Sequence, residues 1–220
     1  MRDILGELTP VEQKLAPSFL HVAGHVDLLR TSPKVAVVGS RRASPEGLTN
    51  ATQVAETLVK LGATVVSGLA EGIDTAAHKA AIRARGRTFA VVGTGLDVAY
   101  PRVNRPLQEH LMAKFAVVSQ FRAGSPPARR NFPQRNRTMA LLSDALVIVE
   151  ASQKSGTISQ GWETLRLGRT LFLMESVVDN PALSWPAEMR RYGAEVLRLK
   201  DLDRVLDDLP CVTTSGALGF

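Results

Sequence analysis

Residues 35–47 read VAVVGSRRASPEG, and this stretch decides the fold. The run Val35–Val38 is apolar without alternation, which is typical of a parallel strand covered on both faces. A glycine turn follows at Gly39. Ser44 is then a suitable N-cap and a proline comes next, so we predict a helix over Pro45–Leu61. A buried strand, a glycine turn and a helix, in this order, are the repeating unit of an α/β protein.

The rest of the chain repeats this alternation. Further apolar runs predict strands at Thr64–Ser67, Thr88–Val92, Phe115–Ser119, Ala145–Val149 and Thr170–Met174. Helical stretches are predicted between them at Asp74–Arg85, Gln134–Leu142 and Ile158–Leu167. Near the ends, SFLHVAG (18–24) predicts an edge strand, and AEVLRL (194–199) with DLDRVLDDL (201–209) predicts a last small βα unit. The predicted fold class is α/β, a Rossmann-like three-layer sandwich with a mainly parallel sheet.

Composition narrows the class of protein. The chain has 220 residues, a net charge of +6 and a pI of about 9.9, which favour a polyanionic partner without requiring one. One cysteine, Cys211, and the lack of a Cys/His cluster predict no disulfide and no metal site, and they fit a reducing cytoplasm. No apolar run approaches the roughly 20 residues that span a bilayer. The N-terminus lacks the apolar segment of a secretory signal. We therefore expect a cytoplasmic protein without membrane contact or cofactor.

The segments that follow the strands are rich in glycine, hydroxyl and basic residues. They are GSRR (39–42), GLAEGID (68–74), GTGLDVAYP (93–101), an arginine-rich loop (122–137) and EASQKSGT (150–157). Ligands of open α/β sheets bind outside the carboxyl ends of the strands, near a topological switch point. These segments would share one rim, and that convergence is better evidence for a site than any single motif.

The turn Gly39–Ser40–Arg41 is a candidate phosphate site. A glycine lets backbone amides approach an anion, the Ser40 hydroxyl can donate, and Arg41 can hold phosphate oxygens through two N–H groups. An ordinary βα turn with solvated arginines is an equal alternative. KSGT (154–157) is a second candidate anion site or a plain helix cap; it is not a P-loop because its order is wrong.

SGLAEGID (67–74) contributes a possible supporting rim, with Ser67, Gly68, Gly72 and Asp74. The default role of Asp74 is to cap a helix. His78 lies four residues later on the same helix face, so an Asp–His catalytic pair is the sharper alternative, and a packed or solvated histidine is the favoured one. GTGLDVAYP (93–101) has only a lone G-x-G and is predicted to be a loop near the ligand.

The stretch ARRNFPQRNR (128–137) is the most informative segment. Arginines neutralise phosphates, and an exposed phenylalanine stacks on a base, worth roughly 1–3 kcal/mol. This combination is typical of single-stranded nucleic-acid binding. In the alternative interpretation Phe132 packs into the core and some of the arginines, Arg137 above all, make structural salt bridges. Further candidates for the supporting rim are Asn131, Arg135 and Asn136.

Taken together, these pieces resemble one family. VAVVGSR, VVSGLAEGIDTAAH, AVVGTGLDVAYPRVN, NFPQRNR, LSDALVIVEA and KSGT, in this order, resemble the Rossmann-like core of DprA/Smf DNA-processing proteins, from about Phe19 to Leu173. The resemblance divides the chain into a lead-in (1–18), a DprA-like Rossmann domain (19–208) and a tail (209–220) expected to be disordered. It implies a protein that is not an enzyme but binds single-stranded DNA in natural transformation and homologous recombination, helps to load the recombinase RecA, and forms a homodimer.

The resemblance also implies roles for residues. The phosphate-binding turn falls on Gly39, Ser40 and Arg41, and the base-stacking aromatic falls on Phe132. Phosphate contacts are further expected from basic residues before Phe132 and from the segment that follows the fifth central strand: Arg129, Arg130, Lys154, Ser155, Gly156 and Thr157.

The chain departs from the family pattern in three places. The usual flanking domains are absent or short, the glycine-rich continuation after Met174 is replaced, and Trp162 and Glu163 stand where small apolar residues are usual. The alternative function is that of a LOG-like protein that binds or hydrolyses nucleotides. Its signature glutamate is replaced by Gln160, which leaves a substitute to be found among Glu71, Glu150 and Glu163. A nucleotide sensor without chemistry is a third possibility.

Overall fold

The computed structural model describes residues 2–5, 7–31 and 33–204. Within these residues eight strands form one sheet, in the order β1-β5-β4-β3-β2-β6-β7-β8. The strands are β1 (His21–Gly24), β2 (Lys34–Gly39), β3 (Thr64–Ser67), β4 (Arg87–Val92), β5 (Ala116–Ser119), β6 (Ala145–Glu150), β7 (Thr170–Met174) and β8 (Glu195–Leu197). Every pairing is parallel except that of β1 with β5, so the predicted edge strand and the mainly parallel sheet are confirmed.

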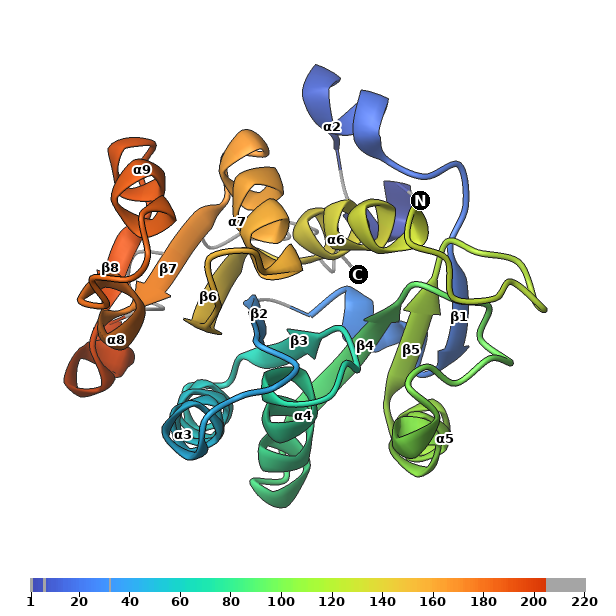
Figure 1. Ribbon diagram of the computed structural model, residues 1–220. Coiled ribbons are helices and arrows are strands. Elements are labelled where there is room, and N and C mark those ends of the chain that lie inside the picture. Colours follow the sequence, from blue (N-terminus) through green and yellow to red (C-terminus); the bar gives the residue numbers. More distant parts are fainter. Residues whose placement is uncertain (1, 6, 32, 205–220) are drawn as a thin grey trace, which may run out of the picture.

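Helices cover both faces of the sheet (Figure 1). α3, α4 and α5 lie on one face, and α6, α7 and α9 lie on the other, which confirms the three-layer sandwich. The α-helices are α1 (Arg2–Leu5), α2 (Pro10–Leu15), α3 (Pro45–Lys60), α4 (Ile73–Arg83), α5 (Arg105–Lys114), α6 (Asn131–Leu142), α7 (Gly156–Arg166), α8 (Glu175–Val178) and α9 (Trp185–Arg191). Short 3₁₀ turns are η1 (Val26–Leu29), η2 (Arg102–Asn104) and η3 (Leu199–Arg204).

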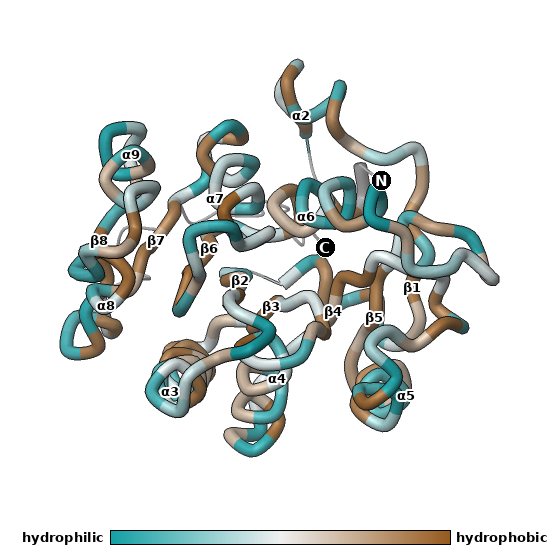
Figure 2. Tube along the Cα trace, viewed as in Figure 1, coloured by the Kyte–Doolittle hydropathy of each residue, from teal (hydrophilic) through white to brown (hydrophobic). Residues whose placement is uncertain are grey.

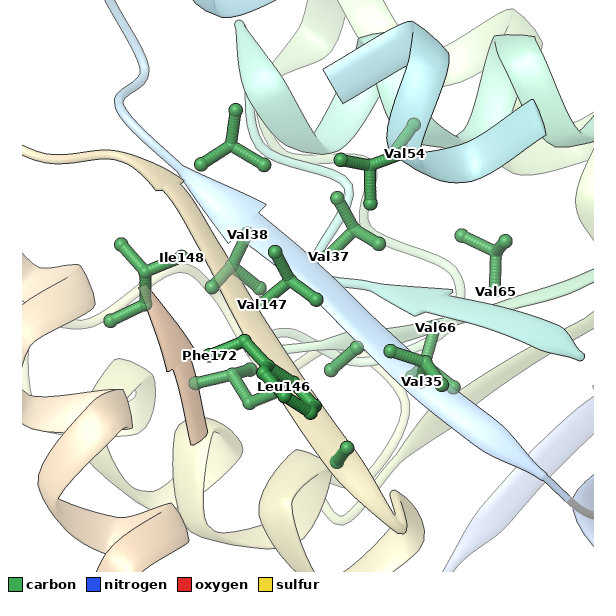
Figure 3. Packing of buried hydrophobic residues seen from close by; sticks show 14 of the residues in the cluster. Val35, Val37, Val38, Val54, Val65, Val66, Leu146, Val147, Ile148 and Phe172 are labelled. Atoms are coloured by element: carbon green, nitrogen blue, oxygen red, sulfur yellow. The ribbon is translucent and has the colours of Figure 1, made fainter. Parts of the chain in front are cut away.

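The central strands are buried on both faces, as their unbroken apolar runs predict. Figure 3 shows Val35, Val37 and Val65 packed with Val54 of α3 on one side and Val147 and Phe172 nearby. Figure 2 shows the same pattern along the chain, with hydrophobic strands between helices of mixed hydropathy. This rigid core fixes the positions from which the strand-end loops start.

Three helices begin earlier than the sequence predicts. α6 begins at Asn131 rather than Gln134, because a proline is tolerated in the first helical turn, where its missing N–H has no partner to lose. α7 begins at Gly156, capped by the hydroxyl of Ser155, rather than at Ile158. α4 begins at Ile73, so Asp74 is inside the helix and is not its cap. NFPQRNR (131–137) therefore belongs to a helix and not to the loop predicted before it.

Two predictions at the ends have different outcomes. β8 and η3 confirm a strand followed by a helical turn up to Arg204. The remainder of DLDRVLDDL and the tail 209–220 lie outside the described residues. None of the helices in the described part of the chain is long and apolar enough to cross a membrane.

Candidate functional site

A groove of about 560 Å³ lies where the chain reverses its direction of travel across the sheet, between the carboxyl ends of β2 and β6. Its lining combines residues from β2, α4, α6 and α7 that are far apart in the sequence. Predicted site residues in this lining are Gly39, Ser40, Arg41, Asp74, Phe132, Arg135, Asn136, Ser155, Gly156 and Thr157. The convergence predicted from the strand ends is therefore present.

The β2–α3 turn is held from both sides. The Ser40 amide donates to the carbonyl of Glu150 at 2.7 Å, and the Ile73 amide donates to the carbonyl of Ser40 at 3.2 Å. Gly72 makes the second contact possible: its φ is +76°, and a methyl group there would lie 2.2 Å from the Ser40 oxygen. These contacts hold the backbone of the turn while Arg41 stays exposed to solvent.

The N-terminus of α7 forms the opposite wall. Ser155 caps this helix by accepting from the Thr157 amide at 3.2 Å, and the Thr157 hydroxyl donates to the Gly39 carbonyl at 3.3 Å. The last three residues of KSGT therefore cap a helix and also line the groove. Anion binding by these residues stays a prediction. The first turn of α7 carries unpaired amide dipoles that favour an anion.

Arg135 and Asp74 form the floor. Arg135 is 7% exposed, its Nε has no hydrogen-bond partner among the described residues, and burial lowers the pKa of its guanidinium. Asp74 Oδ2 accepts from the Gly68 and Ala70 amides at 3.1 and 3.3 Å. Burial raises the pKa of this carboxyl, whereas the charge of Arg135 and the hydrogen bonds from these amides act to lower it. The capping role expected of Asp74 is wrong because its side chain turns back into the β3–α4 loop.

Gly68 gives these two side chains room. A methyl group on Gly68 would lie 1.6 Å from Nη1 of Arg135 and 2.7 Å from Oδ2 of Asp74. Both distances are shorter than side-chain contacts in proteins allow, so a larger residue would displace the arginine from the floor. The glycine predicted as part of the supporting rim thus has a steric function.

Phe132 lies in the first turn of α6, half-buried between two partners. The Arg41 guanidinium lies 5.2 Å from the centroid of its ring, and the Tyr100 ring centre lies 5.8 Å away at 43°. A smaller cavity of about 50 Å³ adjoins the groove here and is lined by Gly68, Gly93, Thr94, Tyr100, Pro101 and Glu71 as well as by the ring. The aromatic therefore faces the site, and the core-packing alternative for Phe132 is wrong.

Several predicted residues lie outside the groove lining. Arg129, Arg130 and Lys154 are exposed, and none of them has an ion-pair partner within the described residues. Their contact with phosphate stays a prediction. Ser67 is buried, and its hydroxyl donates to the Val37 carbonyl at 2.6 Å.

The remaining predicted rim residues connect elements of the fold. Asn131 donates to the Gly93 carbonyl at 3.0 Å, which joins α6 to the β4 loop. Asn136 donates to Ser159 at 3.3 Å, which joins α6 to α7. Arg137 pairs with Glu163 at 3.0 Å, as its structural interpretation predicts. The groove lining also includes Val38, Arg42, Ala70, Ser152 and Gln160. Arg42, Ala70 and Ser152 lie in the predicted rim segments, but none of the five was singled out as a binding residue.

A catalytic Asp–His pair is not formed. His78 is fully buried, and its Nδ1 bonds the Thr88 hydroxyl at 2.8 Å, so the packed-histidine interpretation is confirmed. Burial lowers the pKa of His78 to about 3, so the ring is neutral at pH 7. In the described part of the chain no group of three His, Cys, Asp or Glu residues could hold a metal ion.

Comparison with known proteins identifies the family to which the chain belongs. The family described as DNA recombination-mediator protein A matches residues 7–210. The chain belongs to this family. It is 42% identical to the DNA processing protein DprA of Streptococcus pneumoniae over 165 residues, which are 74% of this chain and 58% of that protein. The chain spans about half the length of the curated relatives that it matches.

Solved structures of the family have the same fold. The X-ray structure of DprA from Streptococcus pneumoniae matches with a TM-score of 0.80 at 35% identity, over 94% of this chain and 72% of that one. The DNA processing protein A of Helicobacter pylori, whose structure concerns its single-stranded DNA binding mode, matches with a TM-score of 0.78 at 28% identity. That match covers 92% of this chain and 95% of the Helicobacter pylori chain.

Proposed function

We propose that this DprA-family chain binds single-stranded DNA along the groove between β2 and β6. The observation that carries the proposal is the meeting of a phosphate-type turn, a buried arginine and a half-exposed phenylalanine in one groove. Ser40, Arg41 and the first turn of α7 would hold backbone phosphates. Phe132, with Tyr100 beside it, would stack on a base. The base would take the place over the ring that the Arg41 guanidinium occupies in this structure.

A polymer fits this site better than a mononucleotide. Exposed Arg129 and Arg130 precede α6, and Lys154 precedes α7, so positive charge extends beyond the groove on two sides. A backbone of repeating phosphates can use such dispersed cations, whereas a mononucleotide cannot reach them. The likeness to a Helicobacter pylori protein whose structure concerns single-stranded DNA binding supports the same choice.

We also propose that the chain binds DNA without catalysing a reaction on it. Two of the glutamates that a LOG-like enzyme would need have other partners: Glu150 accepts from the Ser44 hydroxyl at 2.5 Å, and Glu163 pairs with Arg137. Gln160 occupies the groove where a catalytic carboxylate would be needed. Glu71 lines only the smaller cavity.

Family membership also supports proposals about the biological role of the protein. Membership in the DNA recombination-mediator family supports a part in DNA processing during natural transformation and homologous recombination. Homodimer formation and the loading of a RecA-type recombinase belong to this proposal. A cytoplasmic location also belongs to it, and the single cysteine is consistent with a reducing compartment.

The proposal is tested by comparing three ligands at low salt. Fluorescence anisotropy would measure binding to a labelled single strand, with an unlabelled duplex and a mononucleotide as competitors. We expect the single strand to bind at micromolar concentration or tighter and the mononucleotide to compete only at far higher concentration. Competition by a mononucleotide at equal concentration, or its turnover, would support the LOG-like alternative instead.

A further inference from the structure

Arg135 is a buried cation whose hydrogen-bond donors lack a partner. Its side chain is 7% exposed, yet the described residues provide it with no hydrogen-bond acceptor and no ion-pair partner. Nε is enclosed by protein, whereas the two terminal nitrogens are not, and the residue lines both the groove and the smaller cavity beside it. Burial of a guanidinium costs free energy unless its donors are satisfied, so these nitrogens point to a ligand.

This guanidinium belongs to the same helix face as the ring that is proposed to stack on a base. Phe132 and Arg135 lie three residues apart on α6. The groove and the smaller cavity share four lining residues, which are Arg41, Ala70, Phe132 and Arg135. A base on the Phe132 ring therefore lies where the two spaces meet, with Arg135 at its edge. The smaller cavity, about 50 Å³, cannot enclose a whole base but has room for the atoms at a base edge.

Asp74 makes this position better suited to an uncharged acceptor than to a phosphate. Nη1 of Arg135 and Oδ2 of Asp74 lie 1.6 and 2.7 Å from the same point, the position of a methyl group on Gly68. Oδ2 accepts from the Gly68 and Ala70 amides, which fix the carboxyl group beside the guanidinium. A phosphate that approaches Arg135 also approaches this acidic oxygen, whereas a carbonyl oxygen or ring nitrogen of a base carries no net charge.

We propose that Arg135 reads the base over Phe132 and selects guanine, an inference that rests on the proposed binding of single-stranded DNA. A guanidinium donates two parallel N–H groups to O6 and N7 of guanine, which is the commonest specific contact between arginine and a base. On the corresponding edge adenine has an amino group beside N7, cytosine has an amino group, and thymine has a single acceptor. Guanine alone presents two neighbouring acceptors there, so it satisfies the donors that the protein leaves unpaired.

The test compares heptamers in which thymine alternates with a second base. Fluorescence anisotropy at low salt gives the affinity of each labelled strand. The thymine–guanine strand should bind at least about threefold more tightly than the thymine–7-deazaguanine strand. 7-Deazaguanine keeps the ring system and O6 of guanine and has C–H in place of N7, so the two strands differ in one acceptor at each substituted base. Strands with adenine or cytosine in place of guanine should also bind at least about threefold more weakly than the guanine strand.

Arg135→Lys assigns the preference to one residue. Lysine keeps the positive charge but lacks the planar pair of donors, so the ratio of guanine to 7-deazaguanine affinity should fall toward one. Arg191→Lys on α9 is the same substitution outside the groove and should keep the ratio of the wild type. Each ratio is measured within one protein, so a general loss of affinity in the variant does not imitate the effect.

Equal binding of the guanine and 7-deazaguanine strands by the wild type would overturn the proposal. A preference that persists in Arg135→Lys, or a cytosine or adenine strand that binds as tightly as the guanine strand, would do the same. An all-thymine strand separates this inference from the proposed function. If that strand binds and guanine adds nothing, only the base preference is wrong, and if no strand binds at low salt, both are wrong. The wild-type comparison needs no variant and decides even where Arg135→Lys fails to fold.

Discussion

The Arg41 guanidinium lies over the face of the Phe132 ring, 5.2 Å from its centroid. One residue comes from the turn after β2 and the other from the first turn of α6, so the fold brings the proposed phosphate ligand and the proposed stacking ring together. Cation–π attraction at a partly exposed site is worth about 0.5–1 kcal/mol. A base that takes the place of the guanidinium must therefore offset this contact, and the freed Arg41 can then bind the phosphate beside it.

Removal of the ring should weaken binding without changing its salt dependence. Phe132→Ala should cost about 1–3 kcal/mol of binding free energy, because stacking involves no counterion release. Anisotropy titrations of a labelled single strand at several salt concentrations give both quantities. Phe19→Ala, which removes a 44%-exposed ring next to β1, is the control and should bind like the wild type. A changed salt slope in Phe132→Ala would speak against stacking.

Gly68→Ala should disturb the floor of the groove. The added methyl group would meet Nη1 of Arg135, so we expect a loss of about 1–3 kcal/mol in the free energy of unfolding and weaker DNA binding. Urea unfolding measures the first effect. If the clash is the cause, the cost of Gly68→Ala should be smaller in an Arg135→Ala background than in the wild type. Additive costs in the double variant would contradict this explanation.

His78 should make stability fall in mild acid. Its pKa is about 3 in the folded chain and about 6.5 when unfolded, so below pH 6.5 the unfolded state binds an extra proton. The contribution of the neutral ring to the free energy of unfolding is fully present above pH 6.5. It is lost as the pH falls from 6.5 toward 3, by about 1.4 kcal/mol per pH unit. Urea unfolding at pH 7, 6 and 5 should show this extra slope in the wild type but not in His78→Gln. Equal slopes in both proteins would exclude it.

Arg137 should matter for stability and not for DNA. It is held by Glu163 at 3.0 Å, outside the groove lining. Arg137→Ala should therefore lower the free energy of unfolding by up to about 1 kcal/mol, as expected of a partly exposed ion pair. Its oligonucleotide affinity and salt slope should match those of the wild type. A reduced salt slope would instead identify Arg137 as a phosphate ligand.

The sequence predicts the sheet and the rim because both follow from simple patterns. Unbroken apolar runs such as Val35–Val38 mark buried parallel strands, and the rule for strand ends places Arg41 and Thr157 on one groove. Side-chain direction is not contained in these patterns. Asp74 turns back to two loop amides, and Arg129 and Arg130 are exposed residues outside the groove lining. Tertiary contacts decide such positions.

The pairing of distant residues is equally hidden in the sequence. Asn50 looks like an ordinary polar residue of α3, and only the fold shows that it is largely buried. Similarly, the sequence predicts only that Tyr100 lies in a loop, and the structure places its ring beside that of Phe132.

The central claim is tested most directly by the salt dependence of single-strand binding in the wild type and in Arg41→Ala, with Arg191→Ala on α9 as the control. We predict that the logarithm of the association constant falls linearly with the logarithm of salt concentration, with a slope of about −0.7 for each phosphate contacted. Arg41→Ala should lose roughly one such contact, and Arg191→Ala should lose none. Absence of single-strand binding at low salt, or an unchanged slope in Arg41→Ala, would contradict the account.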